Sequence, residues 1–143
     1  MTRTHVILVV EDDPGDQLLI QEAFGEHGPD RRLEMVADGE DALNFVRRTG
    51  PHAGAPRPDL VLLDLNLPRF DGRAVLRALK ADDDLRPIPV VIFTTSSRKE
   101  DVSGTYALHA NAFITKPVEI DQFFQVMRSI ELFWLEVAKL ARP

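Results

Sequence analysis

The sequence contains no cysteine among its 143 residues. Disulfide bonds, metal sites with thiolate ligands and catalysis by a cysteine nucleophile are therefore excluded together. Packing alone must stabilise the fold, and a chain of this length buries roughly two-thirds of the surface that its unfolded form exposes. We therefore expect a single domain over residues 1–143, built around one compact core.

Basic residues are fewer than acidic residues: 17 Lys and Arg against 23 Asp and Glu, which gives a net charge of −6. Such a chain lacks the positive surface that binds a phosphate backbone, so we expect no nucleic-acid partner. Long hydrophobic runs are also missing: near the N-terminus, the five apolar residues 6–10 are followed at once by acids. This run is too short for a signal peptide or a membrane span, which predicts a cytoplasmic protein without membrane contact.

Glycine-rich phosphate-binding loops are absent too. No stretch has the spacing of a P-loop that ends in Lys and Ser or Thr, and no G-x-G-x-x-G follows an apolar run. Nucleotide-binding enzymes are therefore poor candidates. The hydrophobic fraction of 44% against 28% charged residues is typical of a soluble globular protein and argues against disorder.

What the sequence does contain is a regular alternation of two patterns. Short apolar runs predict strands at residues 6–10, 33–37, 60–63, 90–93 and 112–115. Amphipathic stretches predict helices at about 15–24, 40–48, 73–81, from the "SRKE" segment onward, and from about 119 to 141. In "SRKE", Ser97 and Glu100 have the spacing of a capping box. Because each parallel crossover needs a returning helix, the alternation predicts a doubly wound α/β fold with a five-stranded parallel sheet.

Polar residues follow several of these strands at their carboxyl ends. Glu11 and Asp12 follow the first strand and Asp64 the third, while Thr94 follows the fourth and Lys116 the fifth. Ligands of open parallel α/β sheets bind beyond these ends, near the point where the strand order reverses. Taken singly, each residue could simply cap a helix or end a strand, but together they predict a site at one edge of the sheet.

Other acids in these segments have simpler explanations. Asp13 and Asp16 are expected to cap the first helix, and Asp71 with Gly72 to form a turn. The acids after the first and third strands are harder to explain in this way. Two carboxylates about 4 Å apart repel by roughly 4 kcal/mol at an effective dielectric constant near 20, so a proton or a cation must resolve the conflict.

A divalent cation is the simplest resolution, and Mg²⁺ suits a site of hard oxygen ligands without His or Cys. A Mg²⁺ site beside an acidic side chain, a hydroxyl and a Lys is what phosphoryl transfer to a carboxylate requires. The strand-end residue Asp64 is therefore the candidate nucleophile.

Four blocks of sequence, "VVEDD", "LLDLNLP", "FTTS" and "ITKP", occur in this order and with fitting separations. Together they closely resemble the receiver domain of two-component response regulators, from Val6 to about Met127. The resemblance implies a flavodoxin-like fold and a phosphoprotein of signal transduction, which assists its own Mg²⁺-dependent phosphorylation and dephosphorylation but is no enzyme with a separate substrate. In this interpretation Asp64 accepts the phosphoryl group and Lys116 is the basic partner of the phosphate.

The same resemblance implies the remaining roles. Mg²⁺ would be bound by Asp12, Asp64 and the backbone carbonyl of Asn66, with Glu11 acting through water. Glu11 stands where the family often has Asp, a longer arm that should keep metal binding but change its geometry.

The resemblance also implies a switch. The hydroxyl of Thr94 would move to the phosphoryl oxygen, and Phe113 occupies the place of the rotating switch aromatic.

A narrower resemblance comes from the loop before "RPDLVLLDLNLPRFDG", the "YALHANAFITKPV" segment and the aromatic "ELFWL". These look like the small standalone receivers paired with bacterial phytochrome histidine kinases, which implies a histidine kinase as the phosphoryl donor. A haloacid-dehalogenase-like phosphatase would need a second Asp where Asn66 stands. The stronger alternative is an interaction module that no longer depends on phosphorylation. Such a module should lack the acceptor, a metal ligand or the Lys, whereas this sequence has all of them: Glu11, Asp12, Asp64, Thr94 and Lys116.

The last predicted helix spans about 23 residues, or roughly 35 Å, which is longer than a face of short strands requires. A stripe at helical spacing can face the sheet: Ile120, Phe123, Met127, Ile130, Trp134 and Val137. Phe124, Phe133 and Leu140 widen the apolar surface beyond this stripe. We therefore expect a homodimer with Phe124, Phe133 and Trp134 at its interface. The alternative is that Phe133 and Trp134 fold back onto their own domain.

Overall fold

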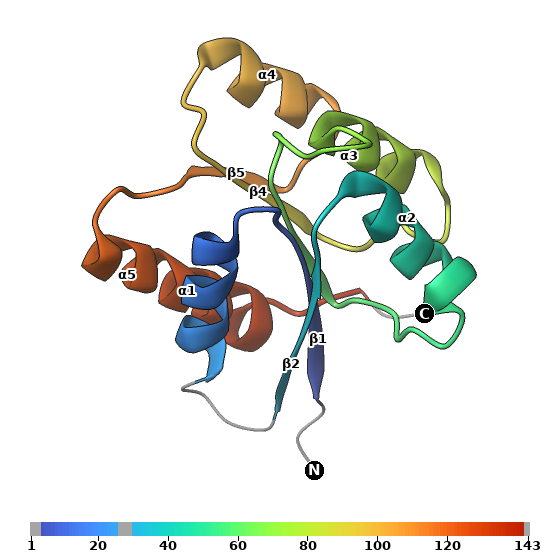
Figure 1. Ribbon diagram of the computed structural model, residues 1–143, viewed down its shortest axis with the longest axis horizontal. Helices are drawn as coiled ribbons and strands as arrows, with labels where there is room; N and C mark the ends of the chain where they lie inside the picture. Colours follow the sequence, from blue (N-terminus) through green and yellow to red (C-terminus); the bar gives the residue numbers. More distant parts are fainter. Residues whose placement is uncertain (1–3, 26–29, 142–143) are drawn as a thin grey trace.

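The computed structural model describes residues 4–25 and 30–141, which form a parallel sheet with helices on both faces (Figure 1). The strand order is β2-β1-β3-β4-β5, and all neighbouring strands run parallel. The strands are β1 His5–Val10, β2 Arg31–Val36, β3 Leu60–Leu63, β4 Val90–Thr94 and β5 Ala112–Thr115. These bounds lie close to the predicted ranges, so the doubly wound five-stranded fold is confirmed.

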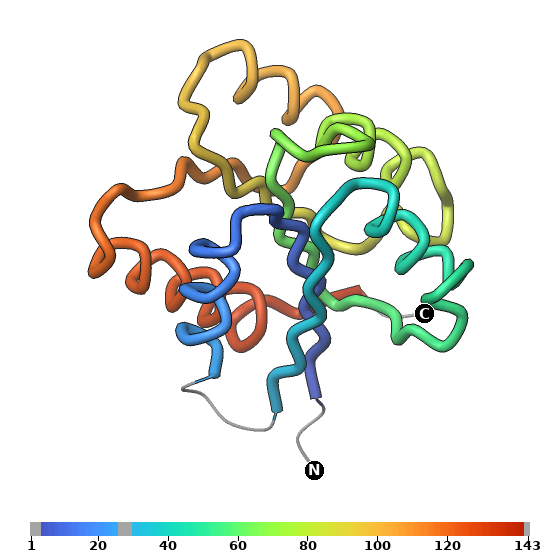
Figure 2. The backbone as a smooth tube through the Cα atoms, in the orientation of Figure 1, coloured from blue at the N-terminus to red at the C-terminus, as the bar shows by residue number. Residues whose placement is uncertain are grey.

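Two layers of helices cover the sheet. The helices are α1 Pro14–Gly25, α2 Gly39–Arg47, the short 3-10 helix η1 Gly50–His52, α3 Gly72–Ala81, α4 Lys99–Ala107 and α5 Ile120–Glu131, which continues as the π-helical turn η2 Leu132–Val137. The tube in Figure 2 shows α1 and α5 side by side on one face, while α2 and α3 lie on the other. Within residues 4–25 and 30–141, no helix is long and apolar enough to cross a bilayer.

The central strand β3 explains why its sequence is apolar without alternation. Val61 and Leu63 pack into the core beneath α2 and α3, whereas Leu60 and Leu62 pack into the core beneath α1 and α5. Because both faces of the strand are covered, every position must be apolar until the strand ends. The first charged side chain after the strand begins is therefore Asp64, which lies directly beyond the carboxyl end of β3.

The extended C-terminal helix is present, but it ends at Val137 rather than at 141. The N–H of Ala138 donates to the carbonyl of Phe133 at 2.7 Å, an i to i+5 bond that widens the last turn. This turn shifts the phase of the helix, so Leu135 is buried while Val137 is 64% exposed. The prediction that Val137 faces the sheet was therefore wrong.

Ile120, at the other end of the predicted stripe, is also 58% exposed. It is the first residue of α5, and helical side chains lean toward the N-terminus, so its side chain projects beyond the helix. Phe123, Met127 and Ile130 are buried against the sheet as predicted.

The predicted capping box at the start of α4 does not form. The N-cap is Arg98, without a side-chain cap bond, because the helix begins two residues after Ser97. Instead, the hydroxyl of Ser96 accepts from the Arg98 N–H at 3.2 Å and donates to Asp101 at 2.6 Å. Asp101 also pairs with Arg73 of α3 at 2.5 Å, which ties α4 to α3.

Candidate functional site

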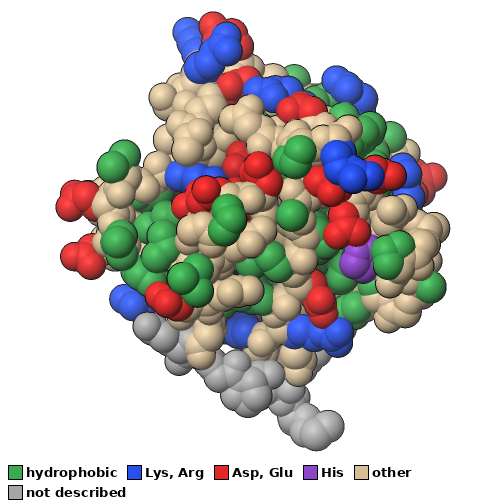
Figure 3. All heavy atoms as spheres, in the orientation of Figure 1, with side chains coloured by type: hydrophobic (Ala, Val, Ile, Leu, Met, Phe, Trp, Pro, Cys, Tyr) green, Lys and Arg blue, Asp and Glu red, His purple; other side chains and the backbone are tan. Residues whose placement is uncertain are grey.

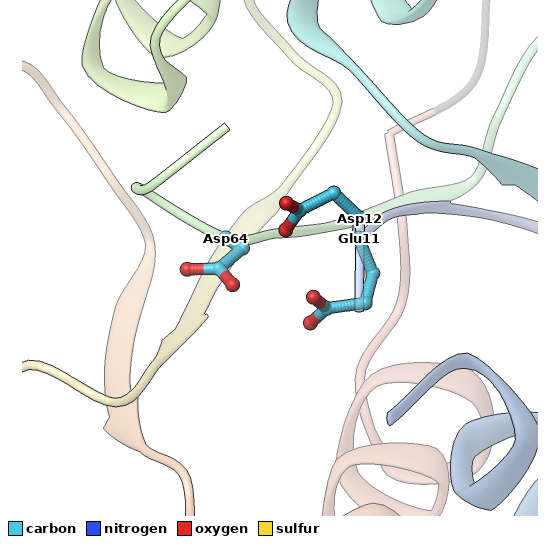
Figure 4. A group of neighbouring side chains, drawn as sticks. All are labelled: Glu11, Asp12 and Asp64. Carbon is cyan, nitrogen blue, oxygen red and sulfur yellow. The ribbon is translucent and has the colours of Figure 1, made fainter. Parts of the chain in front are cut away.

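Three carboxylates meet at the carboxyl ends of β1 and β3. The two strands are paired up to Val10 and Leu63, so the residues that follow them, Glu11, Asp12 and Asp64, come out side by side. One carboxylate oxygen of each residue lies within 4.8 Å of those of the other two, around one small space (Figure 4). After β1 the chain continues into α1 on one face of the sheet, and after β3 it continues into α3 on the other face. The cluster therefore lies at the topological switch point.

The cluster combines buried and exposed acids. Glu11 and Asp64 are only 2% and 6% exposed, whereas Asp12 is open to solvent. Acidic side chains gather near the middle of this face in Figure 3. Burial raises the pKa of Glu11 to about 7, against the lowering effect of hydrogen bonds from Lys116 and the Asp13 N–H. A divalent cation would favour the ionised carboxylates, and three hard oxygen donors around one space fit such an ion.

Lys116, which follows β5, lies against this cluster. Its Nζ contacts Glu11 Oε1 at 2.6 Å, Asp16 Oδ2 at 2.8 Å and Asp64 Oδ2 at 2.9 Å. Burial lowers the pKa of Lys116, but the hydrogen bonds to Asp16, Glu11 and Asp64 outweigh it and raise the pKa above its usual value. The side chain therefore stays a cation at the centre of the acids.

The sequence alone did not reveal the contact between Asp16 and Lys116. We predicted that Asp13 and Asp16 cap the first helix, but only Asp13 does so, because its Oδ2 accepts from the Asp16 N–H at 2.8 Å. The side chain of Asp16 is left free to reach Lys116. No local pattern could have revealed it, because Asp12 lies outside α1, where helical spacing does not apply, and Lys116 is 100 residues further along the chain.

The turn after Asp64 is held by close backbone contacts. The Gly72 N–H donates to the carbonyl of Leu65 at 2.9 Å, and a Cβ at Gly72 would lie 2.1 Å from the carbonyl oxygen of Asp64. Only glycine fits there. Asp71 and Gly72 do not form an isolated turn, because Asp71 is the N-cap of α3. Asn66 is exposed beside the cluster, and its N–H lies 3.3 Å from Asp64 Oδ1.

Thr94, the last residue of β4, is fully buried. Among the described residues, its hydroxyl oxygen is the buried side-chain atom without a hydrogen-bond partner. An unsatisfied buried hydroxyl costs about 1–3 kcal/mol, so a fold keeps one only for a reason. The lysine that follows β5 is tied to the same strand end, since the Lys116 N–H donates to the carbonyl of Thr94 at 2.6 Å.

Phe113 lies on the edge strand β5, next to β4. It pairs in register with Ile92 and is partly buried against the core beneath α2 and α3. Its N–H donates to the hydroxyl of Tyr106 in α4 at 3.1 Å, which connects β5 to that helix. A rotation of the Phe113 ring stays a prediction.

The family follows from comparison with known proteins. Residues 7–128 match the model of the response regulator receiver domain. This chain belongs to that family. The response regulator Rcp1 of Synechocystis sp. is 44% identical to this receiver over 135 residues, which cover 94% of the receiver and 92% of Rcp1.

Two solved structures are similar over nearly their whole length. The crystal structure of the Mn²⁺-bound form of Rcp1 has a TM-score of 0.92 and 43% identity, and covers 96% of this receiver and 99% of that chain. The phosphorylated cyanobacterial phytochrome response regulator RcpA has a TM-score of 0.94 and 44% identity, over 97% and 99% of the two chains. The flavodoxin-like receiver fold and the resemblance to phytochrome-associated receivers are thereby confirmed, and the acidic cluster is consistent with divalent metal binding as in receivers.

Proposed function

We propose that this receiver accepts a phosphoryl group on Asp64 from a histidine kinase. The observation that carries the proposal is the position of Asp64, which shares one small space with Glu11 and Asp12 and is hydrogen-bonded to Lys116 at 2.9 Å. A carboxylate oxygen of Asp64 attacks the phosphorus, and the bond from phosphorus to the donor nitrogen of the kinase breaks. The Lys116 ammonium donates to an equatorial phosphoryl oxygen as negative charge develops there.

Mg²⁺ is the cofactor of this reaction. Asp12, Asp64 and the backbone carbonyl of Asn66 would hold the ion directly, and Glu11 through water. When bound, the ion neutralises the charge on the phosphoryl oxygens. The fit rests on the donor set, because the buried acids otherwise repel one another and, among the described residues, Lys116 is the cation that pairs with them.

The signal would pass through Thr94 and Phe113. The unpaired Thr94 hydroxyl donates to a phosphoryl oxygen, which satisfies a buried group that has no partner among the described residues. Phe113 then turns into the space that Thr94 leaves and carries the change to α4, to which its backbone is bound through Tyr106.

The partners follow from the relatives and from the surface. RcpA is a cyanobacterial phytochrome response regulator and AtBRR a bacteriophytochrome response regulator, which supports a histidine kinase of the bacterial phytochrome type as the donor. We propose that the two proteins meet in the cytoplasm. A second copy of the chain is proposed as the other partner, because Leu132, Phe133 and Val137 are 52%, 51% and 64% exposed on the C-terminal turn.

Intact-mass measurement tests phosphorylation directly. With Mg²⁺ and acetyl phosphate, the protein should gain the mass of one phosphoryl group, and removal of Mg²⁺ should prevent the gain. Asp64→Asn should gain none, while Asp83→Asn, the same change at an exposed acid beyond the far end of α3, should behave as the parent. A parent protein that stays unmodified would favour a phosphorylation-independent interaction module, and a modified Asp64→Asn protein would refute the assignment.

A further inference from the structure

Asp16 differs from the other acids of the site because it belongs to a helix and does not follow a strand. It lies in the first turn of α1, where its N–H is bound by Asp13 Oδ2 at 2.8 Å. Its own carboxylate reaches Lys116 at 2.8 Å, and the side chains of the pair are 24% and 6% exposed. The contact joins α1 to the end of β5 across a gap of 100 residues in the sequence.

The ammonium group of Lys116 has three N–H donors, and it meets three carboxylates. Two of these change their role in the proposed reaction. Glu11 would help to hold the metal ion through water, and the carboxylate of Asp64 becomes an acyl phosphate whose negative charge lies on the phosphoryl oxygens. Asp16 is the one partner of the three that the reaction leaves unchanged.

We infer that Asp16 is a positioning residue, which holds the Lys116 ammonium in place while Glu11 and Asp64 exchange their partners. The inference rests on the proposed phosphorylation of Asp64. A lysine side chain is long and flexible, and its charge is useful only while it stays within hydrogen-bond reach of the phosphoryl oxygens. A fixed carboxylate on α1 keeps one N–H engaged and leaves the other two for the reacting group.

Asp16 also affects the charge next to the metal ion. Loss of the Asp16 carboxylate removes one negative charge from beside the site, where Lys116 keeps only its contacts with Glu11 and Asp64. Mg²⁺ binding should then weaken by electrostatics alone. The effect on positioning must therefore be measured as the phosphorylation rate at saturating Mg²⁺, separately from Mg²⁺ affinity.

Asp16→Asn is the sharpest variant, because it keeps the size of the side chain and one acceptor oxygen but removes the charge. We expect its phosphorylation by acetyl phosphate at saturating Mg²⁺ to be slower by about tenfold. Glu22→Gln is the matched control, since it makes the same change of charge at an exposed position of the same helix. Its rate should equal that of the parent.

A double-mutant cycle then distinguishes positioning from a general structural role. In the Lys116→Met background, Asp16→Asn should cause no further slowing, because the side chain through which it acts is gone. Equal slowing in both backgrounds, or no slowing in the parent background, would overturn the inference. If the parent itself takes up no phosphoryl group, the proposed function fails instead, so the two failures are distinguishable.

Discussion

At the scale of single residues, Thr94 combines complete burial with a hydroxyl that has no hydrogen-bond partner within residues 4–25 and 30–141. Thr94→Val keeps the shape of the side chain and removes the polar group. We expect the free energy of unfolding to rise by about 1 kcal/mol, because the buried oxygen no longer has to be desolvated without a partner. Urea unfolding of the unphosphorylated protein measures the change.

Thr105→Val is the control for this prediction. Thr105 is 1% exposed, but its hydroxyl donates to the carbonyl of Asp101 at 2.8 Å, so its loss should destabilise the protein. Thr94→Val should also lose the phosphorylation-dependent change in hydrogen exchange that we expect across residues 95–120. A destabilised Thr94→Val protein would show that the hydroxyl is satisfied in solution.

Asp12 is the exposed member of the acidic cluster and the simplest one to remove. Asp12→Ala should weaken Mg²⁺ binding by at least about tenfold, or 1.4 kcal/mol, because the remaining acids leave the ion under-coordinated. Titration calorimetry at constant pH measures the affinity, with Asp83→Ala as the control. Equal affinities of Asp12→Ala and the parent would exclude Asp12 as a ligand.

At the scale of elements, Lys80 joins the end of α3 to the starts of β4 and β5. Its buried Nζ donates to the carbonyls of Arg86 and Ile88 and to the side-chain oxygen of Asn111, at 3.0, 2.9 and 3.1 Å. Asn111 in turn accepts from the Val90 N–H at 2.8 Å. Lys80→Met should therefore lower the free energy of unfolding by roughly 2 kcal/mol, since the buried carbonyl of Ile88 and two partly buried acceptors lose this donor.

The pH dependence of this contribution has a definite sign. Burial lowers the pKa of Lys80 below its ordinary value of 10.5, so the folded state loses this proton before the unfolded state does. Between the lowered pKa and 10.5 the unfolded state binds more protons, and stability rises with pH through this window. Parent and Lys80→Met should therefore differ in their pH dependence, whereas the exposed Lys99→Met should follow the parent. Parallel pH profiles would contradict this prediction.

At the scale of the whole molecule, the structure separates the three residues that we predicted at a dimer interface. Phe133 is 51% exposed, while Phe124 and Trp134 are partly buried against the core beneath α1 and α5. The rings of Phe133 and Trp134 meet edge to face at 5.1 Å. Trp134 thus supports its own domain, and Phe133 is the better test of association.

Phe133→Ala should shift a dimer toward monomer in sedimentation equilibrium with little change in unfolding free energy. Trp134→Ala should instead destabilise the fold, because it removes packed apolar area from the core. A parent protein that is monomeric at high micromolar concentration, with and without phosphorylation, would refute the proposed homodimer.

The sequence by itself determined the sheet and the identity of its reactive edge. An apolar run such as Leu60 to Leu63 is stable only where both faces of the strand are covered, as they are between two layers of helices. Parallel strands bring their carboxyl ends to one edge of the sheet. The meeting of Glu11, Asp12, Asp64 and Lys116 follows from these local patterns. The sequence predicted the lengths and first residues of the helices only in part. Helical periodicity does not show where a turn changes its pitch or which residue becomes the cap.

Only the tertiary structure decided the contacts that local patterns do not encode. Asp16 has the spacing of a capping acid, and its bond to Lys116 depends on how α1 lies beside the end of β5. The π-helical turn buries Leu135 in the core and exposes Val137 to solvent, because one widened turn rotates the side chains of the residues that follow it. That the Thr94 hydroxyl finds no partner in the described part of the chain is likewise a property of the packed interior, where the atoms around a hydroxyl come from several strands and helices at once.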